Sequence, residues 1–159
     1  MNNSVLLDTS FLISLVDAKR KNHIKAKEYY KYFIDNKINM ILSAIVTSEF
    51  CIKQPITDLP LENFKSLPFN IPDSYHISNL FEDKFKNVHY DISRVSVKDD
   101  YKIASQCNFN KITYLITEDE PLFTLLNSLQ LEKNITFKPL LLQDGYEKSF
   151  GLQKTLFSL

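Results

Sequence analysis

Two short apolar runs, each followed by an acidic residue, constrain the fold of this chain more than any other feature. Ser-Val-Leu-Leu directly precedes Asp8, and Tyr-Leu-Ile-Thr comes just before Asp119. Both runs are continuous and rich in branched residues, which is typical of strands buried on both faces of a parallel sheet. Ligands of open parallel sheets bind outside the carboxyl ends of the strands. The sequence therefore predicts that Asp8 and Asp119 lie at that edge.

Strand and helix patterns alternate along most of the chain. Strands are predicted at 5–7, 38–42, 112–117 and 135–142. The helices predicted between them run from Thr9 or Ser10 to Val16, over 23–34, from Ser43 or Thr47 past Glu49, over 96–107 and over 122–129. This alternating order predicts an α/β protein.

The segment over 55–72 contains several prolines but stays apolar. We expect it to form short helix and loop and not an extended linker. A further helix is predicted over 73–85, with Ile77, Leu80, Phe81 and Phe85 on one face.

Length and composition favour one globular domain. The chain has 159 residues, of which 44% are hydrophobic, and this is enough apolar surface for one core but too little for two. We expect the main domain over 1–143 and an extension over 144–159, which packs on the same domain or on a partner. The two cysteines, Cys51 and Cys107, lie in apolar helical patterns, and we expect buried, reduced thiols.

Neither a membrane span nor a basic secretory leader is visible, so we expect a cytoplasmic protein without a membrane partner. The 19 basic and 19 acidic residues balance, so any contact with nucleic acid must be local. The best candidate is a basic stretch made of Lys19, Arg20, Lys21, Lys25, Lys27 and Lys31. Scattered lysines are common on surfaces, so a solvated helix face is the favoured interpretation.

Four acids stand where apolar runs end or begin: Asp8, Glu49, Asp100 and Asp119. If they converge to within about 5 Å, each pair would repel by about 3 kcal/mol at an effective dielectric constant near 20. A divalent cation reverses the sign of that energy, and oxygen ligands favour Mg²⁺ or Mn²⁺ over Zn²⁺. We therefore predict one Mg²⁺ or Mn²⁺ site.

A metal held by carboxylates can activate a water and neutralise charge on a phosphoryl oxygen. The chain has only two glycines and no glycine-rich phosphate loop, so metal-assisted phosphodiester hydrolysis is the predicted reaction class. A lone Asp at a helix start is usually only a cap, and this interpretation stays open for Asp99 or Asp100 taken singly. Asp8 is harder to explain that way, because a charge at the end of a buried strand needs a partner or a metal.

The sequence around these acids resembles the PIN-domain family of ribonucleases, which includes the VapC-type toxins of bacterial toxin–antitoxin pairs. The four matching motifs are Val-Leu-Leu-Asp-Thr-Ser-Phe-Leu with Asp8 and Ser10, Ile-Leu-Ser-Ala-Ile-Val-Thr-Ser-Glu-Phe with Glu49, Val-Lys-Asp-Asp-Tyr-Lys-Ile-Ala with Asp100, and Tyr-Leu-Ile-Thr-Glu-Asp with Thr117 and Asp119. They occur in the family's order and span about residues 4–142.

The resemblance implies a three-layer α/β/α sandwich with a central parallel sheet. It also implies Mg²⁺- or Mn²⁺-dependent endonucleolytic cleavage of RNA, and it admits an antitoxin partner and a homodimer. Asp8, Asp100 and Asp119 would bind the metal, and Glu49 would be a further ligand or a base that orients water. The supporting candidates are Ser10, Thr117 and Asp99.

Arg94 and Lys98 lie just ahead of the third acid and are candidates for binding a substrate phosphate. The third and fourth acid could each be assigned one residue away. Asp99 adjoins Asp100, and Asp119 stands between Glu118 and Glu120.

Two other functions compete with a nuclease. The neutral charge and the apolar tail, which contains Phe150, Leu152, Leu156, Phe157 and Leu159, allow a catalytically inactive PIN-like binding or scaffold domain. A phosphotransfer domain with Asp8 as nucleophile is less favoured, because the phosphatase version needs an acid two residues later, where this chain has Ser10.

Overall fold

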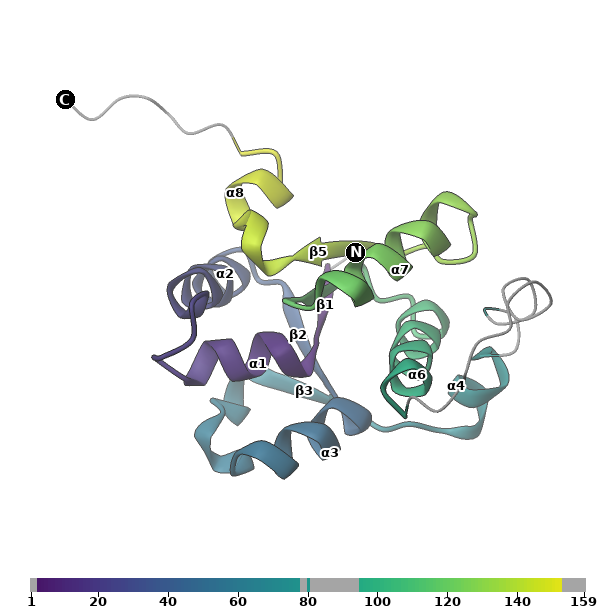
Figure 1. The fold of residues 1–159 in the computed structure, drawn as a ribbon, viewed down its shortest axis with the longest axis horizontal. Helices are drawn as coiled ribbons and strands as arrows, with labels where there is room; N and C mark the ends of the chain where they lie inside the picture. Colours follow the sequence, from purple (N-terminus) through teal and green to yellow (C-terminus); the bar gives the residue numbers. More distant parts are fainter. Residues whose placement is uncertain (1–2, 78–79, 81–94, 153–159) are drawn as a thin grey trace.

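A five-stranded, all-parallel sheet forms the centre of the computed structural model, which describes residues 3–77, 80 and 95–152 (Figure 1). The strands are β1 (Ser4–Leu7), β2 (Asn39–Ser43), β3 (Phe64–Leu67), β4 (Tyr114–Thr117) and β5 (Lys138–Leu141). Their order across the sheet is β3-β2-β1-β4-β5. The buried strand β1 therefore lies in the middle.

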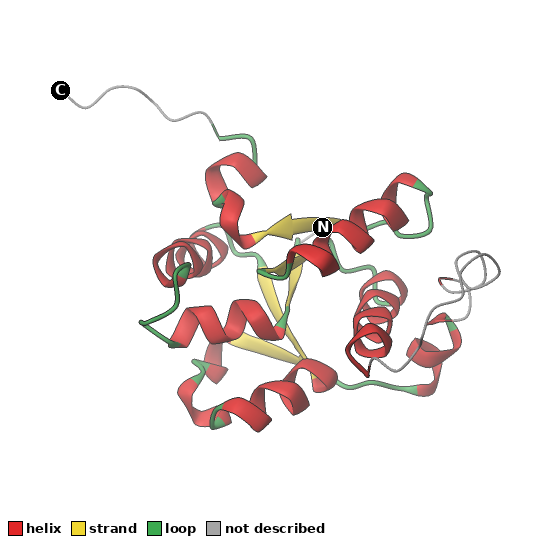
Figure 2. Ribbon diagram, in the orientation of Figure 1, coloured by secondary structure: helices red, strands yellow, loops and turns green. Residues whose placement is uncertain are grey.

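Helices lie on both sides of the sheet (Figure 2). They are α1 (Thr9–Val16), α2 (His23–Asp35), α3 (Ala44–Lys53), α4 (Ile71–Tyr75), α6 (Val95–Phe109), α7 (Glu120–Leu131) and α8 (Tyr146–Ser149). The predicted α/β fold with helical layers around a parallel sheet is confirmed. Among the described residues, no helix is both long and apolar enough to cross a membrane.

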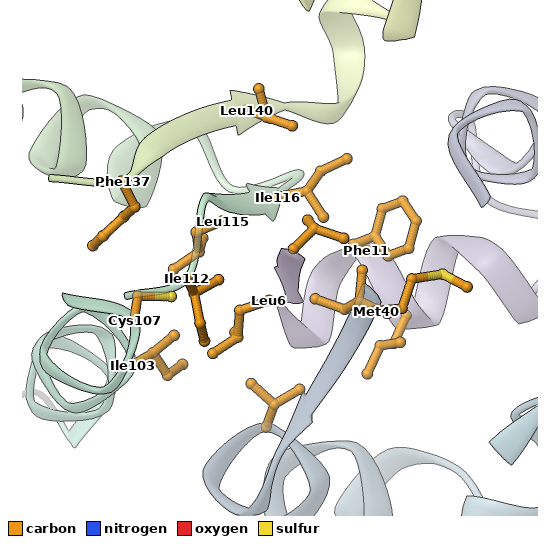
Figure 3. Packing of buried hydrophobic residues seen from close by; sticks show 14 of the residues in the cluster. Leu6, Phe11, Met40, Ile103, Cys107, Ile112, Leu115, Ile116, Phe137 and Leu140 are labelled. Carbon is orange, nitrogen blue, oxygen red and sulfur yellow. The ribbon is translucent and has the colours of Figure 1, made fainter. Parts of the chain in front are cut away.

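Successive strand residues contribute to the core on opposite faces of the sheet. Leu6 and Leu115 lie toward Ile103 of α6, whereas Ile116 lies toward Phe11 of α1 (Figure 3). All five side chains are at most 1% exposed. Burial on both faces explains why these strands read as continuous apolar runs, and each such side chain stabilises the fold by about 1.5–3 kcal/mol.

The edge strand β3 corrects one prediction. Short helix and loop were expected over 55–72, but Phe64–Leu67 pairs with β2, with Met40 opposite Phe64. None of the four residues is buried, so β3 lacks the apolar run that marks β1 and β4. Two short 3₁₀ helices, Ile56–Asp58 and Leu61–Asn63, agree with the expectation for the preceding residues.

Helix α4 begins earlier than the helix predicted over 73–85. Asn70 and Asp73 form a reciprocal capping box, and Pro72 occupies the first turn. Most of the remaining predicted span lies outside the described residues.

The start of the 144–159 segment packs on the domain. The ring of Phe150 lies 4.6 Å from that of Tyr32 on α2 and 5.3 Å from that of Tyr114 on β4. Residues 153–159, which include much of the predicted apolar tail, are outside the described part.

Of the two cysteines, Cys107 is buried as predicted, but Cys51 is exposed, because it lies on the outer face of α3.

Candidate active site

The site lies where the chain changes direction across the sheet. After β1 the chain continues to β2 and β3 on one side, and after β4 it continues to β5 on the other. The point between β1 and β4 is therefore a topological switch point, where open α/β sheets bind ligands. The backbone N–H of Asp8 donates to the carbonyl oxygen of Ile116 at 3.0 Å, so the carboxyl ends of β1 and β4 lie side by side there.

Asp8 is 6% exposed, and hydrogen bonds fix its carboxylate. Its Oδ2 accepts from Ser10 Oγ at 2.6 Å, from Thr117 Oγ1 at 2.8 Å and from the backbone N–H of Ser10 at 3.3 Å. The last contact makes Asp8 the N-cap of α1, where Thr9 or Ser10 had been expected. These bonds and the positive end of α1 offset the cost of burying a charge.

The two hydroxyl groups also hold the loop that carries the fourth acid. Ser10 Oγ accepts from the backbone N–H of Glu118 at 2.8 Å, and Thr117 Oγ1 accepts from that of Asp119 at 3.0 Å. Both predicted supporting hydroxyls thus contact Asp8 and orient the β4–α7 junction.

Glu49 reaches the site from α3, which Ser43 caps. Its Oε2 accepts from Thr9 Oγ1 at 2.5 Å, a contact that sequence reasoning missed. Burial raises the pKa of Glu49, the Thr9 hydrogen bond opposes this effect, and the charges of Asp8 and Asp99 raise the pKa further. Glu49 is therefore close enough to both acids to interact with their charges.

Asp100 on α6 is the carboxyl group whose pKa the other predicted acids raise. Burial and, after it, the charges of Asp8, Asp119, Glu49 and Asp99 raise its pKa from 3.8 to about 7. All four predicted acids, although they come from distant parts of the chain, therefore interact electrostatically at this edge of the sheet.

Neighbouring acids have different partners. Asp99 Oδ1 pairs with Lys102 Nζ at 2.7 Å. Asp119 caps α7 by accepting from the backbone N–H of Leu122 at 2.9 Å, and its charge acts on Asp100. Glu120 is exposed in the first turn of α7.

Glu118 turns away from the other acids. It accepts hydrogen bonds from Asn22 Nδ2 at 2.8 Å, from Arg20 Nη2 at 3.0 Å and from Ser14 Oγ. Burial by itself would raise the pKa of Glu118, but these hydrogen bonds and the charge of Arg20 outweigh it and lower the pKa. No sequence signal predicted these partners, because they come from α1 and from the loop that follows it, about 100 residues away.

The donor set has the chemistry that hard cations prefer, because it consists of carboxylate oxygens. Within the described ranges, however, no three His, Cys, Asp or Glu side chains are grouped closely enough to form a metal site. Metal binding by Asp8, Asp100 and Asp119 stays a prediction.

Neither predicted phosphate ligand can be placed. Arg94 lies outside the described residues, and Lys98 belongs to the part of α6 for which only the backbone is described.

Comparison with known proteins identifies the fold. No family model and no curated protein matches the sequence. Among solved structures, a chain of the VapBC2 complex from Rickettsia felis bound to a promoter DNA fragment aligns with a TM-score of 0.57 at 13% identity, over 86% of this chain and 97% of that chain. This chain has a PIN-domain fold of the VapC type.

Two further VapC-type structures agree with this. A chain of DNA-bound VapBC from Salmonella typhimurium aligns with a TM-score of 0.55 at 14% identity, over 89% of this chain and 99% of that chain. VapC20 of Mycobacterium tuberculosis, a toxin that cleaves the sarcin-ricin loop, aligns with a TM-score of 0.51 at 14% identity, over 76% of this chain and 93% of that chain. At such identities, the similarity shows the fold alone.

Proposed function

We propose that this PIN-like protein is a Mg²⁺- or Mn²⁺-dependent endoribonuclease and the toxin of a toxin–antitoxin pair. The observation that supports the proposal is the raised pKa of Asp100, to which the charges of Asp8, Asp119 and Glu49 contribute after burial. These acids come from four separate parts of the chain, and a bound divalent ion would relieve the repulsion that raises the pKa values of Glu49 and Asp100 after burial.

Asp8, Asp100 and Asp119 would hold the metal ion. A bound divalent ion would supply an activated water and would neutralise charge that develops on a phosphoryl oxygen. Asp8 is preorganised for this role, because the hydrogen bonds described for it all go to Oδ2 and leave Oδ1 free among the described residues. Asp100 would lose its proton when a cation binds, so metal affinity should increase as pH rises through about 7.

Glu49 would orient the attacking water and accept its proton. Its raised pKa makes it a better base than an ordinary surface carboxylate, and Thr9 fixes one of its oxygens. The other oxygen is then available to a water molecule or to the metal.

RNA is the proposed substrate, by analogy with the toxin that cleaves the sarcin-ricin loop. Two of the fold neighbours come from VapBC complexes, which supports an antitoxin as a partner for this chain as well. We also propose a homodimer and a cytoplasmic location. Light scattering of the purified chain, alone and with its antitoxin, tests both assemblies.

Cleavage of labelled RNA tests the proposed activity. The wild-type protein should cleave a panel that includes single-stranded RNA and the sarcin-ricin loop in Mn²⁺, and EDTA should stop the reaction. Asp8→Asn should lower kcat at least about 100-fold without loss of fold, because it removes a metal ligand. Asp35→Asn is the matched control, since Asp35 is an exposed acid at the end of α2.

Equal cleavage by wild type and Asp8→Asn would reject a metal-dependent nuclease at this site. Absence of cleavage across the panel, with the protein folded and Mn²⁺ present, would favour the catalytically inactive binding domain.

A further inference from the structure

The loop that joins α1 to α2, residues 17–22, is attached to the candidate active site through Glu118. Arg20 and Asn22 of this loop donate to the Glu118 carboxylate at 3.0 and 2.8 Å, and Ser14 at the end of α1 donates a third hydrogen bond. Asn22 is 6% exposed, so its bond is shielded from water. The loop is therefore held at the β4–α7 junction by more than a surface ion pair.

Glu118 itself is fixed from the other side. Its carbonyl oxygen accepts from Gln143 Nε2 at 2.8 Å, and its backbone N–H donates to Ser10 Oγ. The next residue, Asp119, acts on Asp100 through its charge. Glu118 is thus a fixed anchor: its backbone is hydrogen-bonded at the β4–α7 junction, and its side chain holds the loop.

The loop that Glu118 holds at the β4–α7 junction carries positive charge. Lys19, Arg20 and Lys21 are consecutive and exposed. Arg20 is engaged by Glu118, but among the described side chains neither Lys19 nor Lys21 takes part in an ion pair. An RNA strand that approaches clustered carboxylates needs cations beside them to hold its phosphates.

We propose that Glu118 is a positioning residue that holds the 17–22 loop beside the acidic site, so that Lys19 and Lys21 bind phosphates of the RNA substrate. This inference rests on the proposed ribonuclease function. It assigns a role to an acid that does not face the other carboxylates, and to the two loop lysines of the basic stretch.

The direction in which Glu118→Gln changes KM distinguishes this positioning role from a simple effect of charge. Removal of one negative charge near the substrate should by itself tighten RNA binding. If Glu118 positions the loop, KM should instead rise about fivefold while kcat changes less than about twofold. Glu120→Gln is the matched control, because it removes the same charge two residues away without touching the loop, and its KM should stay unchanged or fall. A lower KM in Glu118→Gln would overturn the proposal.

A double-mutant cycle tests whether Glu118 acts through the lysines. Lys19→Ala/Lys21→Ala should raise KM. It should also make the negative slope of the log binding constant against log salt shallower by about 1.4, the value for two single-strand phosphate contacts. Added to that pair, Glu118→Gln should raise KM no further, because the groups it positions are gone. Additive effects would overturn the proposal. If Glu118→Gln does not fold, Arg20→Gln, at an exposed position, takes its place in the same cycle.

Hydrogen exchange measures the anchor independently of activity. The backbone N–H of Arg20 in the loop donates to the carbonyl oxygen of Asp17, and that of His23 at the start of α2 donates to the carbonyl oxygen of Arg20, at 3.1 Å each. Their exchange should be faster in Glu118→Gln and unchanged in Glu120→Gln, and equal exchange in both would contradict the anchor.

A wild-type protein that neither binds nor cleaves RNA would defeat the proposed function as well, whereas cleavage with an unchanged KM in Glu118→Gln would defeat this inference alone.

Discussion

Asp100 has a strongly raised pKa in the folded protein. Its pKa of about 7 in the folded protein compares with 3.8 for an unperturbed Asp, with burial as the largest cause and the neighbouring acids next. Between these two values, the folded state holds a proton that the unfolded state has released. The free energy of unfolding contributed by Asp100 therefore falls as pH rises through this window.

This sign predicts that Asp100→Asn stabilises the metal-free protein. In EDTA at pH 8, urea denaturation should show a gain of about 1–2 kcal/mol, after allowance for the partial exposure of the carboxylate. Near pH 4, where Asp100 is protonated in the native state, the gain should nearly vanish. Asp35→Asn, on the surface, should show no such pH-dependent gain, and a gain of the same size at both pH values would contradict the assigned pKa.

Thr117 tests the hydrogen bonds that orient Asp8. Thr117→Val keeps the shape of a fully buried side chain but removes the donor to Asp8 Oδ2 and the acceptor for the Asp119 backbone. We expect a loss of about 1–3 kcal/mol in the free energy of unfolding, together with weaker Mn²⁺ binding. In the control Thr47→Val, the lost bond lies within one turn at the start of α3, and Mn²⁺ affinity should not change. Unaltered Mn²⁺ affinity in Thr117→Val would mean that the hydroxyl does not prepare Asp8 for a metal.

At this scale, the sequence identified residues better than it identified their contacts. Asp8 and Thr117 could be selected because they lie at the ends of buried strands, and all three of Asp8, Ser10 and Thr117 match a motif. The bond from Thr9 to Glu49 and the partners of Glu118 could not, since they join segments 40 to about 100 residues apart. Periodicity within one element carries no information on such pairs.

Helix α6 is held to the sheet by a buried amide. Gln106 is fully buried, and its Oε1 accepts from Ser43 Oγ at 2.6 Å while its Nε2 donates to the carbonyl oxygen of Pro68 at 2.9 Å. It thus joins α6 to the end of β2 and to the residue after β3. Because Asp100 lies on the same helix, this amide also helps to set the position of the third acid.

Gln106→Leu should therefore weaken both the fold and the site. It leaves the Ser43 hydroxyl and the Pro68 carbonyl without their partner, and we expect a loss of about 2–3 kcal/mol in the free energy of unfolding. RNA cleavage should fall at temperatures where the variant is still folded. Gln130→Leu, which removes one bond from a half-buried amide, should cost less than about 1 kcal/mol. Equal costs for the two variants would show that the buried network has no special role.

Elements were predictable where their burial leaves a pattern of apolar residues in the sequence. β1 and β4 are buried on both faces, and their apolar runs predicted them. The edge strand β3 has no buried residue and was missed, because its existence depends on pairing with β2 and not on its own composition. The early start of α4 follows from its Asn70 and Asp73 capping box, a signal that was present in the sequence.

At the scale of the whole molecule, the sheet brings acids that are far apart in sequence to one edge. A parallel sheet directs the carboxyl ends of all its strands to one edge, and the strand order places β1 beside β4. The alternating β/α order was enough to predict the class of fold and this edge. The distances between the acids could not be predicted, because they depend on how α3 and α6 pack.

One measurement tests the central claim, that these carboxyl groups form a single divalent-ion site: titration of the metal-free protein with Mn²⁺, monitored by calorimetry. The wild-type protein should bind one Mn²⁺ ion, and Asp8→Asn, Asp100→Asn and Asp119→Asn should each weaken binding at least about tenfold, whereas Asp35→Asn should not. A wild-type protein that binds no Mn²⁺, or variants that all bind it as the wild type does, would contradict the claim.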